Sequence, residues 1–300
     1  MRKGNRKVRR YNKSEKSILE GNALRIRWGI IREMVGNGGG HIGGSLDLAD
    51  MLSVIYTDCI RVDINNPSWE DRDYMILSKG HAGPALYSAL AFKGFFPENR
   101  LDSLNKPDVF LPGHADRRVP GVDATTGSLG QGLSIACGAA LAAKIKRSEQ
   151  VIFCIIGDGE SDEGQIWEAA QAAAHYKLDN LIAFLDWNKM QIDGSNDEVM
   201  SLGDPQIKFA AFDWNAVKVK GNCVTEISDA VANALEKPNG KPTMIILDTL
   251  KGEGIIGVSS MKNNHCIGFP EPLRSESIAE LQKKAKELGI ELDESWIEKK

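Results

Sequence analysis

The sequence lacks any long hydrophobic run and any excess of positive charge. No stretch approaches the roughly 20 apolar residues that a helix needs to cross a bilayer, so we expect no membrane association. The 300 residues carry a formal net charge of −4, which gives no overall electrostatic reason to bind nucleic acid. Basic residues within positions 1–14 form a local cluster, which we predict to be a solvated N-terminal arm; no apolar segment of a secretory signal follows it.

Cysteine and histidine are also scarce, with five of each. No CxxC, HxH or HExxH spacing occurs, which disfavours zinc as the explanation of any site. Scattered cysteines without paired spacing favour a reduced protein of the cytoplasm. Against these absences stands a hydrophobic fraction of 42%, which is enough for the core of one large α/β domain.

The most informative stretch runs from Val151 to Asn188. An apolar run ends in Gly157-Asp158-Gly159, a helical pattern follows, and a second apolar run leads to Asn188. This order predicts strand, tight turn, helix and strand, with Asp158 and Asn188 at the ends of neighbouring strands. Ligands of open α/β sheets bind at such strand ends, and a helix N-terminus favours phosphate. The side-chain oxygens of Asp158 and Asn188 suit Mg²⁺ or Ca²⁺. The stretch therefore predicts a metal-bridged diphosphate.

Each of these residues also has a plainer interpretation. An isolated Gly-Asp-Gly fits an Asx turn about as well as a metal site. The acidic residues Glu160 and Glu163 suit the first turn of a helix without any catalytic role. Asn188, which follows in order, favours the metal interpretation of Asp158.

Alternating strand and helix patterns along the chain predict a largely parallel sheet covered by helices on both faces. Strands are predicted at 74–77, 151–156, 181–185, 217–219 and 244–247, and helices around 14–35, 45–55, 86–92, 133–146, 225–235 and 275–288. Ser14 and Ser45 are the predicted N-caps of the first two helices, and 191–204 is a predicted polar loop. We divide the chain into the arm (1–14), one domain (15–272) and a C-terminal helix and tail (273–300).

The glycine-rich segment at residues 36–44 resembles a dinucleotide-binding fingerprint only superficially. That motif follows a strand, whereas this segment follows a predicted helix. A Rossmann site is therefore disfavoured.

Four of the five histidines lie in predicted loops or turns. His41, His81 and His114 each adjoin a glycine, and His265 precedes Gly268 by three positions, whereas His175 lies in a helical pattern and is interpreted as structural. A lone loop histidine is usually a surface residue, but four in such settings predict a shared cleft suited to proton transfer and phosphate binding.

Two lysines, Lys79 and Lys251, lie at predicted strand ends beside a glycine. They fit equally well as surface residues and as contacts to a phosphate or a carboxylate.

Together these motifs resemble a known family. Gly157-Asp158-Gly159, Glu163-Gly164 and Asn188 match the motif of thiamine-diphosphate enzymes. Segments that resemble transketolase in particular are Gly40-His41, Leu77 to Ala82, Pro112-Gly113-His114, Thr125 to Gly132, and Lys251-Gly252 with Asn264-His265. The matches run in order along nearly the whole chain. The resemblance implies a three-layer thiamine-diphosphate-binding α/β fold with a mainly parallel central sheet flanked by helices.

The resemblance also implies a role for each matching residue. The metal, Mg²⁺ (or Ca²⁺ or Mn²⁺), would be held by Asp158, Asn188 and the carbonyl of Met190. Thiamine diphosphate would be contacted by His81, Lys79, Gly127, Ser128, Leu129, Gly157, Asp158, Gly159, Glu160, Asn188, Lys251 and His265. His41 and His114 would face the reacting sugar, and Glu163 would belong to a carboxylate network between two cofactor sites. The implied reaction transfers a two-carbon ketol unit from a ketose phosphate to an aldose phosphate.

Three departures from the family pattern stand out. Ile42 replaces a common proline, and Asn264 replaces a frequent tryptophan. Transketolases are also longer, with a pyrimidine-binding domain that supplies the glutamate that activates the cofactor, and nothing after His265 resembles that domain. We therefore expect the N-terminal subunit of a split transketolase, active with a separate C-terminal subunit and homodimerised within an α2β2 heterotetramer.

Three alternatives remain open. The first is that the subunit belongs to an enzyme specialised for a branched or unusual sugar phosphate. Deoxyxylulose-phosphate synthase is disfavoured by the Gly-Ser-Leu-Gly-Gln-Gly and Pro-Gly-His segments. A non-catalytic thiamine-diphosphate-binding homologue is disfavoured because Asp158, Asn188 and the histidines are all present.

Overall fold

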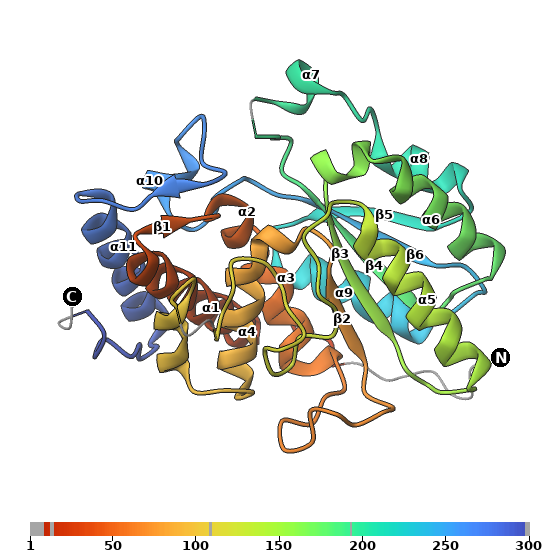
Figure 1. Ribbon diagram of the computed structural model, residues 1–300, viewed down its shortest axis with the longest axis horizontal. Helices are drawn as coiled ribbons and strands as arrows, with labels where there is room; N and C mark the ends of the chain where they lie inside the picture. The colour runs from red at the N-terminus through yellow and green to blue at the C-terminus, as the bar shows by residue number, and fades with distance from the viewer. Residues whose placement is uncertain (1–8, 13–14, 108–109, 193, 298–300) are drawn as a thin grey trace.

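The computed structural model describes residues 9–12, 15–107, 110–192 and 194–297 and has a five-stranded sheet at its centre (Figure 1). All neighbouring strands of this sheet are parallel. In spatial order the strands are β2 (Tyr74–Leu77), β3 (Ile152–Gly157), β4 (Leu181–Trp187), β6 (Thr243–Asp248) and β5 (Asn215–Lys220). The predicted parallel sheet and its five strands are confirmed, with each strand within two residues of its predicted bounds.

The central strands are buried on both faces, as expected for a parallel sheet between helical layers. Phe153 and Ile155 of β3 belong to one core, while Ile152, Cys154 and Ile156 belong to the other, which is the two-residue period of a strand. The second core includes residues of α5 (Gln131–Ile145), α6 (Gly164–His175) and α8 (Pro205–Ala211). The first is built from α1 (Lys16–Asn37), α3 (Ala49–Val54), α4 (Gly83–Lys93), α9 (Val224–Glu236) and α11 (Leu273–Leu288).

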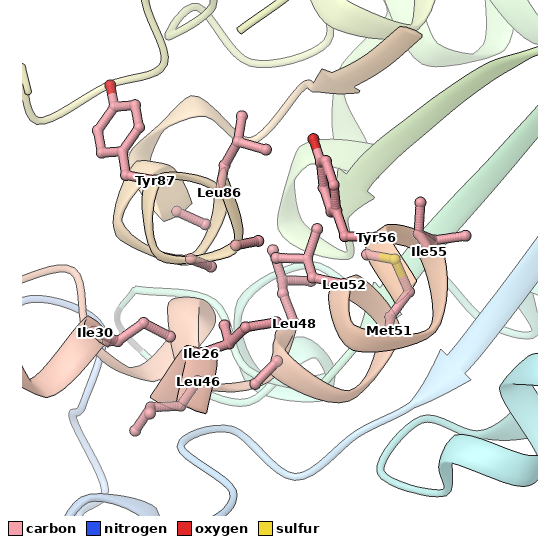
Figure 2. Packing of buried hydrophobic residues seen from close by; sticks show 14 of the residues in the cluster. Ile26, Ile30, Leu46, Leu48, Met51, Leu52, Ile55, Tyr56, Leu86 and Tyr87 are labelled. Carbon is pink, nitrogen blue, oxygen red and sulfur yellow. The ribbon is translucent and has the colours of Figure 1, made fainter. Parts of the chain in front are cut away.

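The segment after α1 differs from its prediction. Instead of one helix capped by Ser45, the chain forms α2 (Gly43–Leu46) and α3, followed by a π-helical turn (Ile55–Cys59). Ser45 lies inside α2, where its hydroxyl donates to the carbonyl of His41 at 2.6 Å. Because the helix already begins at Gly43, Ser45 comes too late to cap it and bonds four residues back instead. Figure 2 shows Leu46, Leu48 and Leu52 of this segment in the core near Ile26.

Short elements complete the connections and refine two further predictions. The predicted polar loop 191–204 contains α7 (Asn196–Val199), which begins with a capping box between Ser195 and Glu198, and α8 follows it without having been predicted. The segment directly after Gly157 is a 3₁₀ turn (Gly159–Asp162), and α6 starts only at Gly164. The remaining pieces are β1 (Gly39–Gly40), β7 (Ile267–Gly268), α10 (Ile256–Ser259) and 3₁₀ turns at Gly80–Ala82 and Glu98–Ser103.

Both ends of the described chain are attached to the domain. Arg10 forms ion pairs with Asp229 and Glu236 of α9, and Tyr11 is 9% exposed. Arg9 and Arg10 are nevertheless exposed, so their side chains meet solvent while Tyr11 is buried. Residues 1–8 and the predicted cap Ser14 are outside the described ranges, and the solvated arm at 1–14 stays a prediction. At the other end, Trp296 packs on Trp28 with ring centroids 5.1 Å apart. The domain boundary at 272/273 stays a prediction.

No helix in the described ranges is long and apolar enough to cross a membrane.

A buried acid in α1 yields a prediction on stability. Glu33 is fully buried; Ser88 donates to its Oε1 at 2.8 Å, and its Oε2 has no hydrogen-bond partner among the described residues. Burial raises the pKa of Glu33 well above its usual value, despite the opposing Ser88 bond. Above about pH 4.3 the carboxyl group of Glu33 keeps its proton in the folded state, whereas the unfolded chain releases it. Glu33 therefore lowers the free energy of unfolding as the pH rises above this value.

We expect Glu33→Met to raise the free energy of unfolding by about 1–3 kcal/mol at pH 8 and by less at pH 5, because the buried carboxyl is removed. Urea unfolding at the two pH values measures this. Glu98→Met, at an exposed position, is the control and should change neither value. An equal effect of Glu33→Met at both pH values would contradict the explanation.

Candidate active site

A cavity of ≈ 410 Å³ lies at the carboxyl ends of the central strands. This is the edge at which parallel α/β sheets bind ligands, and the volume is in the range of small-molecule sites. The cavity is lined by fourteen of the sixteen predicted site residues: His41, Lys79, His81, His114, Gly127, Leu129, Gly157, Asp158, Gly159, Glu160, Asn188, Met190, Lys251 and His265. The structure therefore brings together residues that are up to 224 positions apart in the chain.

The two predicted residues that do not line the cavity are Ser128 and Glu163. Both are exposed. Ser128 lies in the turn before α5, and Glu163 is the N-cap residue of α6 without a side-chain capping bond. Their predicted roles stay predictions.

The four loop histidines form one cluster, as predicted. The ring centroid of His41 lies 5.3 Å from those of His81 and His265 and 5.8 Å from that of His114. A small antiparallel pairing explains how His41 and His265 meet, because β1 and β7 pair Gly39 with Gly268. A Cβ on Gly39 would lie 2.3 Å from the carbonyl oxygen of Ile267, so the pairing needs glycine there.

The surroundings of His41, His81 and His265 favour neutral imidazoles. Burial, and then Lys79, lowers the pKa of His81 to about 2. Burial, and then Lys251, lowers that of His265 to about 4. The pKa of His41 is also lowered by burial, with a contribution from His114. Neutral histidines at pH 7 can donate an N–H bond to a phosphate oxygen or exchange a proton with a hydroxyl group.

Both predicted lysines are buried, so the surface interpretation is wrong for them. Lys79 is 3% exposed and Lys251 is 5% exposed. Burial opposes the charge of Lys79, but Asp186 and Asp47 raise its pKa above the usual value. Its ammonium group lies 2.5 Å from Asp186 Oδ2 and donates to the carbonyl of Gly44 at 2.9 Å. Lys251 donates to the carbonyl of Met190 at 3.4 Å, and burial lowers its pKa.

Three oxygen donors at the cavity fit a hard divalent cation. They are the carboxylate of Asp158, the side-chain oxygen of Asn188 and the carbonyl of Met190, and Mg²⁺ prefers such ligands. Asp158 is 4% exposed; burial, and then the charge of Asp186, raises its pKa to about 6. A cation beside Asp158 would offset this penalty on its charged form. The donor set therefore fits the predicted metal.

Glu160 ties three parts of the cavity wall together. Its Oε1 accepts from the hydroxyl of Ser78 at 2.5 Å and from the amide of Gly130 at 2.8 Å, and its Oε2 accepts from the amide of Gly157 at 2.9 Å. Burial raises the pKa of Glu160, while these bonds oppose the rise. Its carboxylate is thus occupied by the ends of β2 and β3 and the turn before α5.

Several polar residues at the site were missed by the sequence analysis. Asn196 donates to Asp158 Oδ2 at 3.0 Å, Asp47 accepts from the amide of Asn188 at 2.9 Å, and Asp186 pairs with Lys79. Asp186 stands two positions before Asn188 at a strand end, which was a usable signal. Asp47 lies 141 positions from Asn188, and no local pattern marks that contact.

Comparison with known proteins decides the family. The family model described as "Transketolase, thiamine diphosphate binding domain" matches residues 22–297. The chain belongs to the transketolase family. It is 47% identical over 272 residues to the 6-deoxy-6-sulfo-D-fructose transketolase subunit SqwG of Clostridium sp. (strain MSTE9), covering 90% of this chain and 98% of that protein.

Two further transketolases show how the chain relates to others in length. It is 40% identical over 218 residues to an apulose-4-phosphate transketolase subunit of Phocaeicola vulgatus, covering 72% of this chain and 76% of the relative. A crystal structure of a transketolase variant from Pichia stipitis superimposes with a TM-score of 0.83 at 30% identity. That match covers 93% of this chain and 42% of the solved chain, so this transketolase chain spans less than half of that length.

These findings confirm the resemblance, the three-layer α/β fold, the enzyme class and thiamine diphosphate as the cofactor of the domain. The roles of the individual site residues and the identity of the metal stay predictions.

The lowered pKa of His81 yields a prediction on pH dependence. An unfolded histidine titrates near pH 6.5, whereas folded His81 does so near pH 2. The unfolded chain therefore binds more protons between these values, and His81 makes the free energy of unfolding fall as the pH falls below about 6.5. We expect His81→Asn to remove this contribution in the cofactor-free chain, up to about 1 kcal/mol per pH unit after solvent screening.

Urea unfolding of wild type and variant between pH 7 and pH 5 measures the two slopes. Asp158 contributes a slope of the opposite sign, because its folded pKa is raised. This contribution is the same in wild type and variant, so it cancels when one slope is subtracted from the other. His175→Asn, at the exposed end of α6, is the matched control and should keep the wild-type slope. Identical slopes for His81→Asn and wild type would refute the prediction.

Proposed function

We propose that the chain is the N-terminal, diphosphate-binding subunit of a two-chain transketolase that transfers a ketol unit from a ketose phosphate to an aldose phosphate. One observation carries the proposal: the oxygen donors and the four histidines meet in one cavity at the carboxyl edge of the sheet. The relative covered over 98% of its length is itself named a transketolase subunit, which supports a separate partner chain.

In this proposal the strand ends bind the charged end of the cofactor. Asp158, Asn188 and the carbonyl of Met190 hold Mg²⁺ (or Ca²⁺ or Mn²⁺) against the diphosphate. His81, His265 and Lys251 line the same cavity, where an N–H or an ammonium group donates to phosphate oxygens. The turn at residues 127–130 is held at the cavity wall by Glu160, which accepts from the amide of Gly130.

Thiamine diphosphate supplies the carbon nucleophile that breaks and forms the sugar carbon–carbon bond. His41 and His114 are neighbours in the histidine cluster and act on the sugar. As a neutral group, His41 accepts a proton from a sugar hydroxyl or donates a hydrogen bond to a developing oxyanion. The partner subunit binds the pyrimidine end and supplies the activating glutamate, and Glu163 joins a carboxylate network between paired sites.

The partner subunit is proposed to bind the rim of the cavity. Exposed apolar side chains lie on the two segments beside it: Ile192, Val199 and Met200 on one, and Leu250 and Met261 on the other. Met200 is 60% exposed and Leu250 is 53% exposed. Such a group at the mouth of a site is typical of an interaction surface. Two copies of each chain in a cytoplasmic α2β2 heterotetramer complete the proposal.

An unusual sugar phosphate as substrate is the second candidate. Two relatives are named for 6-deoxy-6-sulfo-D-fructose and apulose-4-phosphate, respectively. A panel of ketose donors, sulfonated, branched and linear, tested with the assembled enzyme distinguishes this candidate from a transketolase of ordinary sugar phosphates. Higher kcat/KM for a linear ketose phosphate than for the sulfonated and branched donors would reject it.

A mixing experiment tests the proposed function. We expect ketol transfer with thiamine diphosphate and Mg²⁺ when both subunits are present, and none from this chain alone. Asp158→Ala should abolish Mg²⁺-dependent cofactor binding to the complex, because it removes the carboxylate of the donor set. The control Glu70→Ala changes an exposed residue in the loop that precedes β2 and should bind like wild type.

Activity of the purified chain alone would contradict the two-chain proposal. Cofactor binding without ketol transfer by the assembled pair would support the non-catalytic alternative.

The rim yields a separate prediction. We expect Met200→Asp and Leu250→Asp each to weaken association with the partner subunit by about tenfold or more, because a charge replaces apolar area buried in the complex. Analytical ultracentrifugation of the mixed subunits measures this. Ile64→Asp is the matched control, since Ile64 is 41% exposed in the loop before β2. Wild-type association of both rim variants would place the partner elsewhere.

A further inference from the structure

Asp47 connects two parts of the metal end of the cavity without lining the cavity itself. We propose that Asp47 is a positioning residue, which fixes the amide of Asn188 so that its oxygen faces the metal and which holds the turn at Lys251-Gly252 beside it. The proposal rests on the proposed function, because Asn188 is a metal ligand only in that setting.

The location of Asp47 is rigid. It lies between α2 and α3 and is fully buried. Its two neighbours, Leu46 and Leu48, are buried in the apolar core, where Figure 2 shows them near Ile26 of α1. The carboxylate is thus fixed from behind by apolar packing, which makes it suitable as a support for other groups.

The orientation of the Asn188 amide follows from its partners. Its nitrogen donates to Asp47 Oδ2 at 2.9 Å and to Asp186 Oδ2 at 3.2 Å. Both contacts are made by the NH₂ end of the amide to carboxyl oxygens that act as acceptors, so this end faces the two acids. The oxygen therefore points the other way, where it accepts from the amide of Met190 at 3.0 Å. A reversed amide would present donors to the cation and would not bind it.

Asp186 is not sufficient to fix this orientation alone. Its Oδ2 is already paired with Lys79 at 2.5 Å, and its Oδ1 accepts from the hydroxyl of Thr249 at 2.6 Å. Its contact with Asn188 is the longer of the two. Asp47 thus provides the shorter acceptor for the Asn188 amide.

The second oxygen of Asp47 holds the neighbouring turn. Oδ1 accepts from the backbone amide of Gly252 at 2.6 Å. Gly252 has a φ of +86°, and a Cβ there would lie 2.9 Å from Val258. This backbone conformation places Lys251 against the carbonyl of Met190. One carboxylate therefore supports two of the three metal-side oxygens, Asn188 directly and Met190 through Lys251.

Asparagine at position 47 has the shape of aspartate but cannot replace it. Its single oxygen can accept from Gly252 or from Asn188, and its NH₂ group then faces a donor at the other end. The conflict is relieved if the Asn188 amide reverses, which turns its oxygen away from the metal. Asp47→Asn therefore disturbs the metal end without changing side-chain volume.

The test is the Mg²⁺ requirement for thiamine diphosphate binding, measured by calorimetry on the complex with the partner subunit. We expect Asp47→Asn to raise the half-saturating Mg²⁺ concentration by about 10- to 100-fold, as is typical when the support of a metal ligand is removed. Asp47→Ser, which also lacks two acceptors in the required places, should act in the same direction and serves if Asp47→Asn does not fold.

Asp73→Asn is the matched control. Asp73 is also fully buried and accepts from two backbone amides, of Arg61 at 2.8 Å and Val151 at 2.9 Å, at the opposite end of the sheet. It should lower the thermal unfolding midpoint and leave the Mg²⁺ requirement unchanged.

A wild-type Mg²⁺ requirement in a folded Asp47 variant, or an equal shift in Asp73→Asn, would overturn the positioning role. If the wild-type complex binds no cofactor with Mg²⁺, the proposed function itself fails.

Discussion

A buried ion pair connects the carboxyl ends of the strands. Lys79 follows β2 and Asp186 belongs to β4, so their contact at 2.5 Å passes over β3, which lies between them. The last residue of β3 is Gly157, and a Cβ there would lie 3.4 Å from Lys79 Cδ. Because Asp186 also accepts from Thr249 after β6, the same pair reaches four neighbouring strands. Such a pair adds little net stability, but it specifies one arrangement of the strand ends.

The arrangement gives the cavity its electrostatic character. Two buried lysines and several buried carboxylates lie at one edge of the sheet, and burial and the lysines lower the pKa values of His81 and His265 among them. Positive charge is thus kept near the oxygen donors Asp158 and Asn188 without a dense cluster of charged imidazoles. The proposed function assigns both kinds of partner in this space to a diphosphate and its cation.

The elements with strong local patterns were predictable from the sequence. The apolar runs ending at Gly157 and Leu185 identified two central strands. The position of histidines beside glycines in loops indicated that these side chains would lie together. The start of α2 at Gly43, before Ser45, was not predictable, because the amide of Gly43 donates to the carbonyl of the distant Asn264. Asn264 also donates to the carbonyls of Lys251 and Val258, which a pattern of neighbours cannot reveal. Asp47 was missed for the same reason: its partners belong to other strand ends.

The pairing of β1 with β7 has a consequence for how the protein is made. It joins residues near position 40 to residues near position 268, and with them the first and last histidines of the cluster. During synthesis the chain leaves the ribosome from its N-terminus, so His41 emerges long before its neighbour His265 exists. The histidine cluster is complete only after residue 265 has been released. A chain that ends before His265 therefore lacks one member of the histidine cluster.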